Sequence, residues 1–163
     1  MEIIVKEAIL LANSFSSNIH LHAYIFLAQE LGLIPSEYVF DYSFNIPFSE
    51  KLEYEFMLLK SDGIIREVDN GKKIIVNNQQ PYQILNLTSQ QVEKLRIIAA
   101  LEEATLVNLS RLLFLIKKYP ELSAKENSDM LQEKARRSFF MNMGAFKDTS
   151  ARLQILKEKV ILK

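Results

Sequence analysis

The stretch IIREVDNGKKIIV, residues 64–76, is the most distinctive local signal in this chain. Two β-prone runs, 64–68 and 72–76, are joined by the tripeptide Asp-Asn-Gly at 69–71. Because Asn and Gly tolerate positive φ angles, a short linker of this kind between two such runs predicts a tight β-hairpin. The sequence on either side of the hairpin has mainly helical periodicity.

Three helices and one strand are predicted ahead of the hairpin. The first helix covers about 4–13, and the second runs from a serine cap at 16–17 to Gly32. The second helix is apolar on nearly all faces, so we expect it to be central. Aromatic residues alternate over 38–44, which predicts a strand that Pro47 breaks, and Ser49 then caps a third helix ending at Gly63.

The sequence after the hairpin is predicted to be helical. Residues 77–81 form a polar break, and 82–87 have the composition of a further short strand. Thr88 and Gln91 have the spacing of a capping box and open the next helix. Helical periodicity then continues over 105–119, 128–142 and 149–162, with Gly144 separating the last two segments.

This order predicts a mainly α-helical protein with a small β-hairpin or sheet. Helix, helix, strand, helix and hairpin in residues 1–87 are the order of a winged-helix-like domain, in which the strand at 38–44 can join the sheet. Residues 88–163 are predicted to be a helical extension that packs on this domain, with dimerisation as a further option.

Composition narrows the class of protein. The chain has 163 residues, a formal net charge of zero, 48% hydrophobic residues and no cysteine. This is the profile of a compact domain without disulfides, and it fits a reducing, cytoplasmic location. No apolar run approaches the roughly 20 residues of a membrane span, and residues 1–7 do not resemble a secretory signal.

Part of the first domain resembles a known family. Residues 22–29 (HAYIFLAQ), 38–42 (YVFDY), 46–52 (IPFSEKL) and 58–65 (LLKSDGII) are similar to the YwgA-type proteins and to the Panacea, or SocA-like, antitoxin-associated domain. The resemblance spans about residues 19–65. It implies a compact helical domain with winged-helix character that binds a partner, and it implies no established chemistry.

Charge is distributed unevenly along the chain. Residues 1–67 contain four basic and ten acidic residues, whereas residues 134–163 contain eight basic and two acidic residues. The third helix, which stands where a DNA-reading helix would stand, carries Glu50, Glu53 and Glu55 against Lys51 and Lys60. Such a helix is expected to repel phosphates and to be a solvated acidic face.

Two groups of basic residues are candidate contacts for nucleic acid or for an acidic partner. The hairpin group is Arg66, Lys72 and Lys73, and the carboxyl-terminal group is Arg136, Arg137, Lys147 and Arg152. The alternatives for the second group are packing across the acidic half of the same chain or of a second subunit, solvation of its own helix, and interaction with a helix dipole.

Apolar residues predict a protein interface. The runs 112–116 and 139–143 present apolar groups on more than one face of their helices, so one chain is not expected to bury all of them. The candidate interface residues are Phe114, Phe139, Phe140, Met141 and Met143. The alternative, which applies mainly to the first run, is that these residues are core.

The sequence offers no catalytic, cofactor-binding or metal-binding pattern. Its four glycines are scattered, no serine lies in a G-x-S-x-G turn, and no small-molecule substrate is indicated. His20 and His22 are two residues apart on a helix and point in different directions, so we expect one buried and one exposed imidazole and no shared metal.

The sequence therefore predicts a non-enzymatic, winged-helix-like interaction or regulatory protein that binds a protein partner or itself. The alternative is a DNA-binding transcriptional regulator that uses the hairpin and the basic carboxyl-terminal helices.

Overall fold

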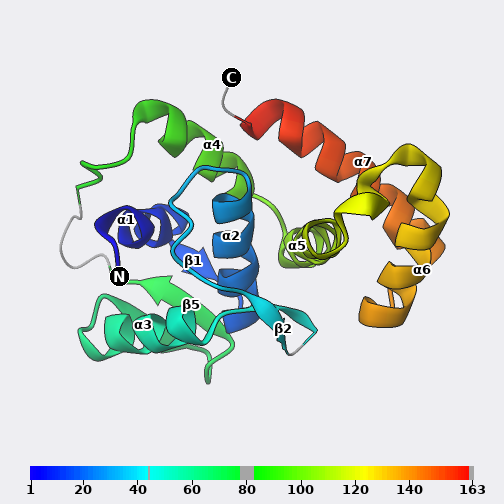
Figure 1. Ribbon diagram of the computed structural model, residues 1–163. Coiled ribbons are helices and arrows are strands. Elements are labelled where there is room, and N and C mark those ends of the chain that lie inside the picture. Colours follow the sequence, from blue (N-terminus) through cyan, green and yellow to red (C-terminus); the bar gives the residue numbers. More distant parts are fainter. Residues whose placement is uncertain (44, 78–82, 162–163) are drawn as a thin grey trace.

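The computed structural model describes residues 1–43, 45–77 and 83–161 (Figure 1). In these residues the protein is mainly helical with a small antiparallel sheet. Its helices are α1 (Ile3–Ala12), α2 (Asn18–Glu30), α3 (Glu50–Ser61), α4 (Ser89–Ala99), α5 (Glu103–Lys118), α6 (Ser128–Phe139) and α7 (Met143–Val160), and short 3-10 turns cover Pro120–Ser123 and Lys125–Asn127. Its strands are β1 (Ser14–Phe15), β2 (Asp41–Ser43), β3 (Ile46–Phe48), β4 (Ile65–Val68) and β5 (Lys73–Val76).

Helix α2 lies at the centre of the molecule, as its apolar sequence predicts. Every residue from Leu21 to Gln29 is buried, and the helix packs against α1, α4, α5 and β3. Its amino terminus is fixed by Ser17, whose hydroxyl accepts a hydrogen bond from the backbone N–H of His20. A helix without a polar face is stable only when it is surrounded by other elements, which explains this position.

The predicted hairpin is present and belongs to a three-stranded sheet with the order β1-β5-β4. Asp69, Asn70 and Gly71 form its turn, and all three have positive φ angles. The third strand is β1, in which Phe15 pairs with Ile74. The prediction that the strand at 38–44 joins this sheet is wrong.

Strands β2 and β3 form a separate two-stranded ribbon. β2 is shorter than the predicted strand and pairs with β3, so that Tyr42 lies opposite Pro47. The prediction that Pro47 breaks the strand is also wrong, because a two-stranded ribbon has open edges on which a residue without an N–H is tolerated. Asn45, with a φ of 61°, lies at the turn of the ribbon.

A buried carboxylate explains why 83–87 is not a strand. Residue 82 lies outside the described residues, and 83–87 are irregular. The carboxylate of Glu7 on α1 accepts hydrogen bonds from the backbone N–H groups of residues 85, 86 and 87 at 3.0–3.1 Å, and from the side-chain amide of Asn86 at 2.8 Å. These donors are therefore not free to form a strand ladder.

The two carboxyl-terminal helices have boundaries that differ from the prediction. Helix α6 ends at Phe139 because Phe140 adopts a left-handed conformation with a φ of 55°. Helix α7 begins at Met143, and the side chain of Asn142 caps it by accepting a hydrogen bond from the N–H of Ala145. Gly144 is therefore in the first turn of α7 instead of separating two helices, and residue 162 lies outside the described residues.

Figure 1 shows how these elements are arranged. The sheet and α3 lie at one end of the molecule, α1 and α2 lie above them, and α6 lies at the other end beyond α5. The buried apolar residues form one continuous cluster that extends from Val5 to Val160. No helix in the described ranges is both long and apolar enough to span a bilayer.

Candidate functional site

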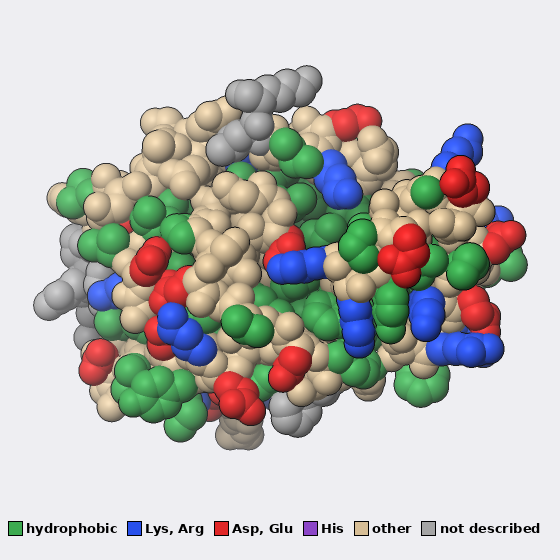
Figure 2. Space-filling model, viewed as in Figure 1, with side chains coloured by type: hydrophobic (Ala, Val, Ile, Leu, Met, Phe, Trp, Pro, Cys, Tyr) green, Lys and Arg blue, Asp and Glu red, His purple; other side chains and the backbone are tan. Residues whose placement is uncertain are grey.

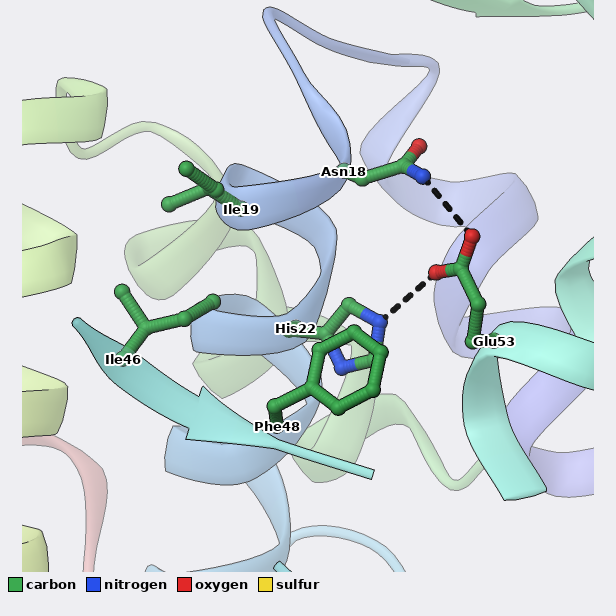
Figure 3. A pocket seen from close by; sticks show the side chains of 6 residues that line it. All are labelled: Asn18, Ile19, His22, Ile46, Phe48 and Glu53. Carbon is green, nitrogen blue, oxygen red and sulfur yellow. Dashed lines mark hydrogen bonds and ion pairs between the residues drawn. The ribbon is translucent and has the colours of Figure 1, made fainter. Parts of the chain in front are cut away.

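A pocket of about 390 Å³ lies between the amino-terminal end of α2, strand β3 and helix α3 (Figure 3). This volume is within the range of about 300–1,000 Å³ that is usual for ligand pockets. Helix α2 contributes Asn18, Ile19 and His22, strand β3 contributes Ile46 and Phe48, and α3 contributes Glu53. Apolar side chains therefore form two sides of the pocket, and three polar side chains follow one another along its remaining wall.

Two helix caps position the polar wall. Ser17 caps α2 and Ser49 caps α3, where its hydroxyl accepts a hydrogen bond from the N–H of Leu52. Residue 53 is therefore in the first turns of α3, and residue 22 is one turn into α2. The N–H of Ser49 also donates to Nδ1 of His22 at 3.3 Å, which connects the start of α3 directly to α2.

His22 is held as a neutral imidazole. It is fully buried, and its ring is stacked on Phe48 with the centroids 4.3 Å apart. Because Nδ1 accepts the Ser49 N–H, the ring proton is on Nε2, which donates to Oε2 of Glu53 at 3.0 Å. Burial lowers the pKa of His22 below its ordinary value, and the neighbouring Glu53 only partly opposes this effect.

The state of His22 predicts a dependence of stability on pH. Burial also lowers the pKa of His20, so in the unfolded chain both histidines bind protons at a higher pH than in the folded chain. The free energy of unfolding is therefore expected to be highest above pH 6.5 and to fall as the pH drops below that value toward the folded-state pKa. NMR titration of the ring signals is expected to place the His22 midpoint below 6.5, with the proton on Nε2. A midpoint at or above 6.5 contradicts this prediction.

Glu53 has only neutral hydrogen-bonding partners among the residues that the structure describes. Oε2 accepts from His22, and Oε1 accepts from the side-chain amide of Asn18 at 2.9 Å. The Glu53 side chain is 27% exposed. The two lysines of the same helix pair elsewhere, Lys51 with Glu37 at 2.8 Å and Lys60 with Glu67 at 2.7 Å. The carboxylate of Glu53 is thus the charged group of the pocket.

The second histidine belongs to a different cluster at the start of α2. Nδ1 of His20 accepts from the backbone N–H of Ser16 at 3.2 Å, and His20 is partly buried instead of exposed as predicted. The carboxylate of Glu103 on α5 accepts hydrogen bonds from the hydroxyls of Ser16 and Ser17. In a catalytic triad the carboxylate orients the histidine, whereas here it bonds to the serines. We therefore interpret this cluster as a structural tie between α5 and α2.

The outward face of α3 carries apolar side chains beside the exposed Glu50 and Lys51, so only part of the predicted acidic face is present. Glu55 is buried and accepts a hydrogen bond from the hydroxyl of Tyr38 at 2.5 Å, and Glu53 faces the pocket. The side chains that remain outside include Tyr54, Met57 and Leu58, which are 63%, 57% and 47% exposed. Their spacing of three and four residues places them on one face of the helix, and this spacing was available from the sequence as a signal. We call these three residues the α3 patch.

The basic candidate residues form two separate groups. Arg66, Lys72 and Lys73 are exposed on the hairpin of β4 and β5. In the second group, Arg136 and Arg137 both pair with Glu133 at 2.7–2.8 Å, Arg152 pairs with Asp148 at 2.9 Å, and Lys147 is exposed. The hairpin lies at one end of the molecule and α6 at the other, and α7 extends from α6 back toward the centre, so the two groups do not form one continuous basic surface (Figure 1).

The five candidate interface residues divide between core and surface. Phe139 and Met141 are buried, and the ring of Phe139 packs edge-on against Tyr42 with the centroids 4.9 Å apart. The prediction of an interface at these two positions is therefore wrong. Phe114 is partly buried near Phe26, and Phe140 and Met143 are exposed.

Comparison with protein-family models, curated proteins and solved structures finds no match to this chain. The resemblance of residues 19–65 to the YwgA-type and Panacea domains therefore stays a prediction. In the described ranges, His, Asp and Glu side chains do not form a group of three or more that could hold a metal ion.

Proposed function

We propose that this chain is a non-enzymatic, winged-helix-like interaction protein that binds another protein, or a second copy of itself, through the α3 patch. The order α1, β1, α2, α3, β4, β5 and the sheet order β1-β5-β4 support a winged-helix-like arrangement. In this arrangement β2 and β3 are an insertion between the second and third helices, and α3 occupies the position of a recognition helix.

The observation that carries the proposal is the chemistry of the outward face of α3. Tyr54, Met57 and Leu58 form an exposed apolar surface, and both lysines of the helix are paired with acids. Figure 2 shows hydrophobic side chains exposed over α3, with acidic side chains nearby, and mixed basic and acidic side chains over α6. Exposed aromatic and methionine side chains are typical of protein interfaces, whereas the affinity for phosphates comes mainly from accessible Lys and Arg.

A photo-crosslinking experiment in the native cell tests this proposal. The photoreactive residue p-benzoylphenylalanine replaces Tyr54, and in a matched control it replaces Phe140, an exposed aromatic residue at the other end of the molecule. We expect a discrete protein adduct from position 54 and none of the same mass from position 140. The additional substitution Met57→Glu is expected to remove the adduct. The proposal fails if both positions give the same adducts or if position 54 gives none.

The exposed cations of the hairpin favour the DNA-binding regulator as the second candidate function. Arg66, Lys72 and Lys73 could contact phosphates as a wing does. We expect no measurable binding of duplex DNA even at a low salt concentration of about 50 mM, since α3 offers no free cation to the groove. Binding that weakens steeply with salt, and that is lost in the double variant Lys72→Ala/Lys73→Ala, would establish the regulator instead.

A further inference from the structure

We propose that the pocket between α2, β3 and α3 binds an organic cation, namely an ammonium or guanidinium group on an aliphatic chain. The inference goes beyond the proposed function, because the pocket lies beside the α3 patch and takes its ligand by different chemistry.

The first argument is the charge of Glu53. Its two hydrogen-bonding partners in the described residues, Asn18 and the neutral His22, carry no positive charge. The first oxygen is 2.9 Å from the amide nitrogen of Asn18, and the second is 3.0 Å from Nε2 of His22. These bonds hold the carboxylate in one orientation and leave it without a cationic partner among the described residues. A carboxylate oxygen has two lone pairs, so each can accept a further hydrogen bond from a cationic ligand.

The second argument is the apolar remainder of the pocket. Ile19 and Ile46 lie on one side, and Phe48 lies against His22 on the other (Figure 3). Among the described residues that line the pocket, a small hydrated metal ion would find one carboxylate and no further acidic ligand. An alkyl chain can instead contact the isoleucines and Phe48 while its charged end reaches Glu53. Lysine, arginine and simple aliphatic amines share this combination of apolar stem and cationic head.

The third argument is that hydrogen bonds within the protein hold the polar wall of the pocket in place. Ser49 fixes His22 through its N–H, His22 fixes Glu53, and Asn18 fixes the second oxygen of the same carboxylate. Binding a cation therefore requires little ordering of protein side chains, which favours affinity for a small ligand.

Two probes and matched neutral compounds test the inference. n-Butylammonium and n-butylguanidinium are titrated into the full chain, with n-butanol and n-butyramide as controls, and ring and backbone NMR signals are followed. We expect saturable shifts at His22 and its neighbours for both cations, with dissociation constants in the millimolar range, and no comparable shifts for the neutral compounds. Equal shifts for cations and neutral compounds would overturn the inference.

Substitutions identify the carboxylate. Glu53→Gln is expected to weaken binding of the cations by at least about tenfold, because it removes the charge and keeps the shape. Glu50→Gln on the same helix does not alter the pocket and is expected to change binding by less than about twofold. Ile19→Lys places an ammonium group at the partly exposed edge of the pocket and is expected to compete with the probe. Unchanged binding in folded Glu53→Gln and Ile19→Lys proteins would contradict the inference.

A comparison with a peptide distinguishes the two sources of the cation, namely a side chain of a protein partner and a free organic cation. An N-acetylated, amidated tripeptide with a central arginine is compared with n-butylguanidinium. Tighter binding of the peptide that is weakened by Tyr54→Ala indicates a side chain of a protein partner. Tighter binding of n-butylguanidinium indicates a free organic cation. The cation titrations need no partner protein. Cation binding can therefore be absent while the crosslink at position 54 forms, or cation binding can be present while the crosslink is absent.

Discussion

Replacing Leu27 by alanine is expected to lower the free energy of unfolding by about 3 to 5 kcal/mol. Leu27 is fully buried in α2, which packs against α1, α4, α5 and β3. The surrounding elements hold one another in place, so they cannot collapse fully into the space that the leucine leaves. Urea denaturation followed by circular dichroism measures the effect.

The control for Leu27→Ala is Ile19→Ala on the same helix. Ile19 is 38% exposed, so this substitution is expected to cost less than about 1 kcal/mol. Because buried residues from both ends of the chain belong to one cluster, a single unfolding transition is expected in each variant. Two separate transitions, of which Leu27→Ala shifts only one, would show that the halves of the chain unfold independently.

Replacing Glu7 by glutamine is expected to lower the free energy of unfolding at neutral pH by about 2 to 4 kcal/mol. The carboxylate is buried and accepts three backbone N–H groups and the amide of Asn86. A glutamine keeps one acceptor oxygen and turns an NH₂ group toward donors that then have no acceptor. Thermal and urea unfolding at pH 7 measure the loss, and Glu93→Gln on the exposed face of α4 is the matched control.

The same substitution is expected to alter the dependence of stability on pH. Burial raises the pKa of the Glu7 carboxyl, but the hydrogen bonds from Asn86 and from the backbone of residues 85–87 outweigh it, and the net pKa is below the ordinary value. The unfolded chain therefore takes up this proton at a higher pH than the folded chain. The stabilisation is present above about pH 4.5 and is lost as the pH falls through the folded-state pKa. In Glu7→Gln the free energy of unfolding is expected to fall less steeply with decreasing pH below about pH 4.5. An unchanged dependence on pH would contradict the role given to Glu7.

The functional candidates from the sequence and those from the structure differ because of side-chain orientation. The sequence counts Glu53 and Glu55 as parts of a solvated acidic face. The structure turns Glu55 toward Tyr38 and Glu53 toward His22. Their positions on the helix could be read from the sequence, but their partners lie 17 and 31 residues away along the chain, and a local pattern does not reveal such partners. The spacing of Tyr54, Met57 and Leu58, which places them on one face of the helix, could also be read from the sequence.

The basic carboxyl-terminal residues also show that a local sequence pattern does not reveal contacts with distant segments. Counting charges over 134–163 gives a strong positive excess. In the structure Glu133, just outside that range, pairs with both Arg136 and Arg137. Pairs three and four residues apart are predictable from helical geometry. The separation of these arginines from the hairpin was not predictable, because it depends on how α5 places α6 relative to α2.

The local features of this protein follow directly from its sequence: the serine caps of α2 and α3, the capping box at Thr88, the turn of the hairpin and the apolar character of α2. Each depends on residues within a few positions of one another, where backbone preference and helical spacing act directly. Three other features depend on the three-dimensional fold: β1 completes the sheet, Glu7 binds the backbone of residues 85–87, and His22 and Glu53 meet beside Phe48. Those contacts join distant segments, and their geometry is set by the packing of the whole core instead of by any local preference.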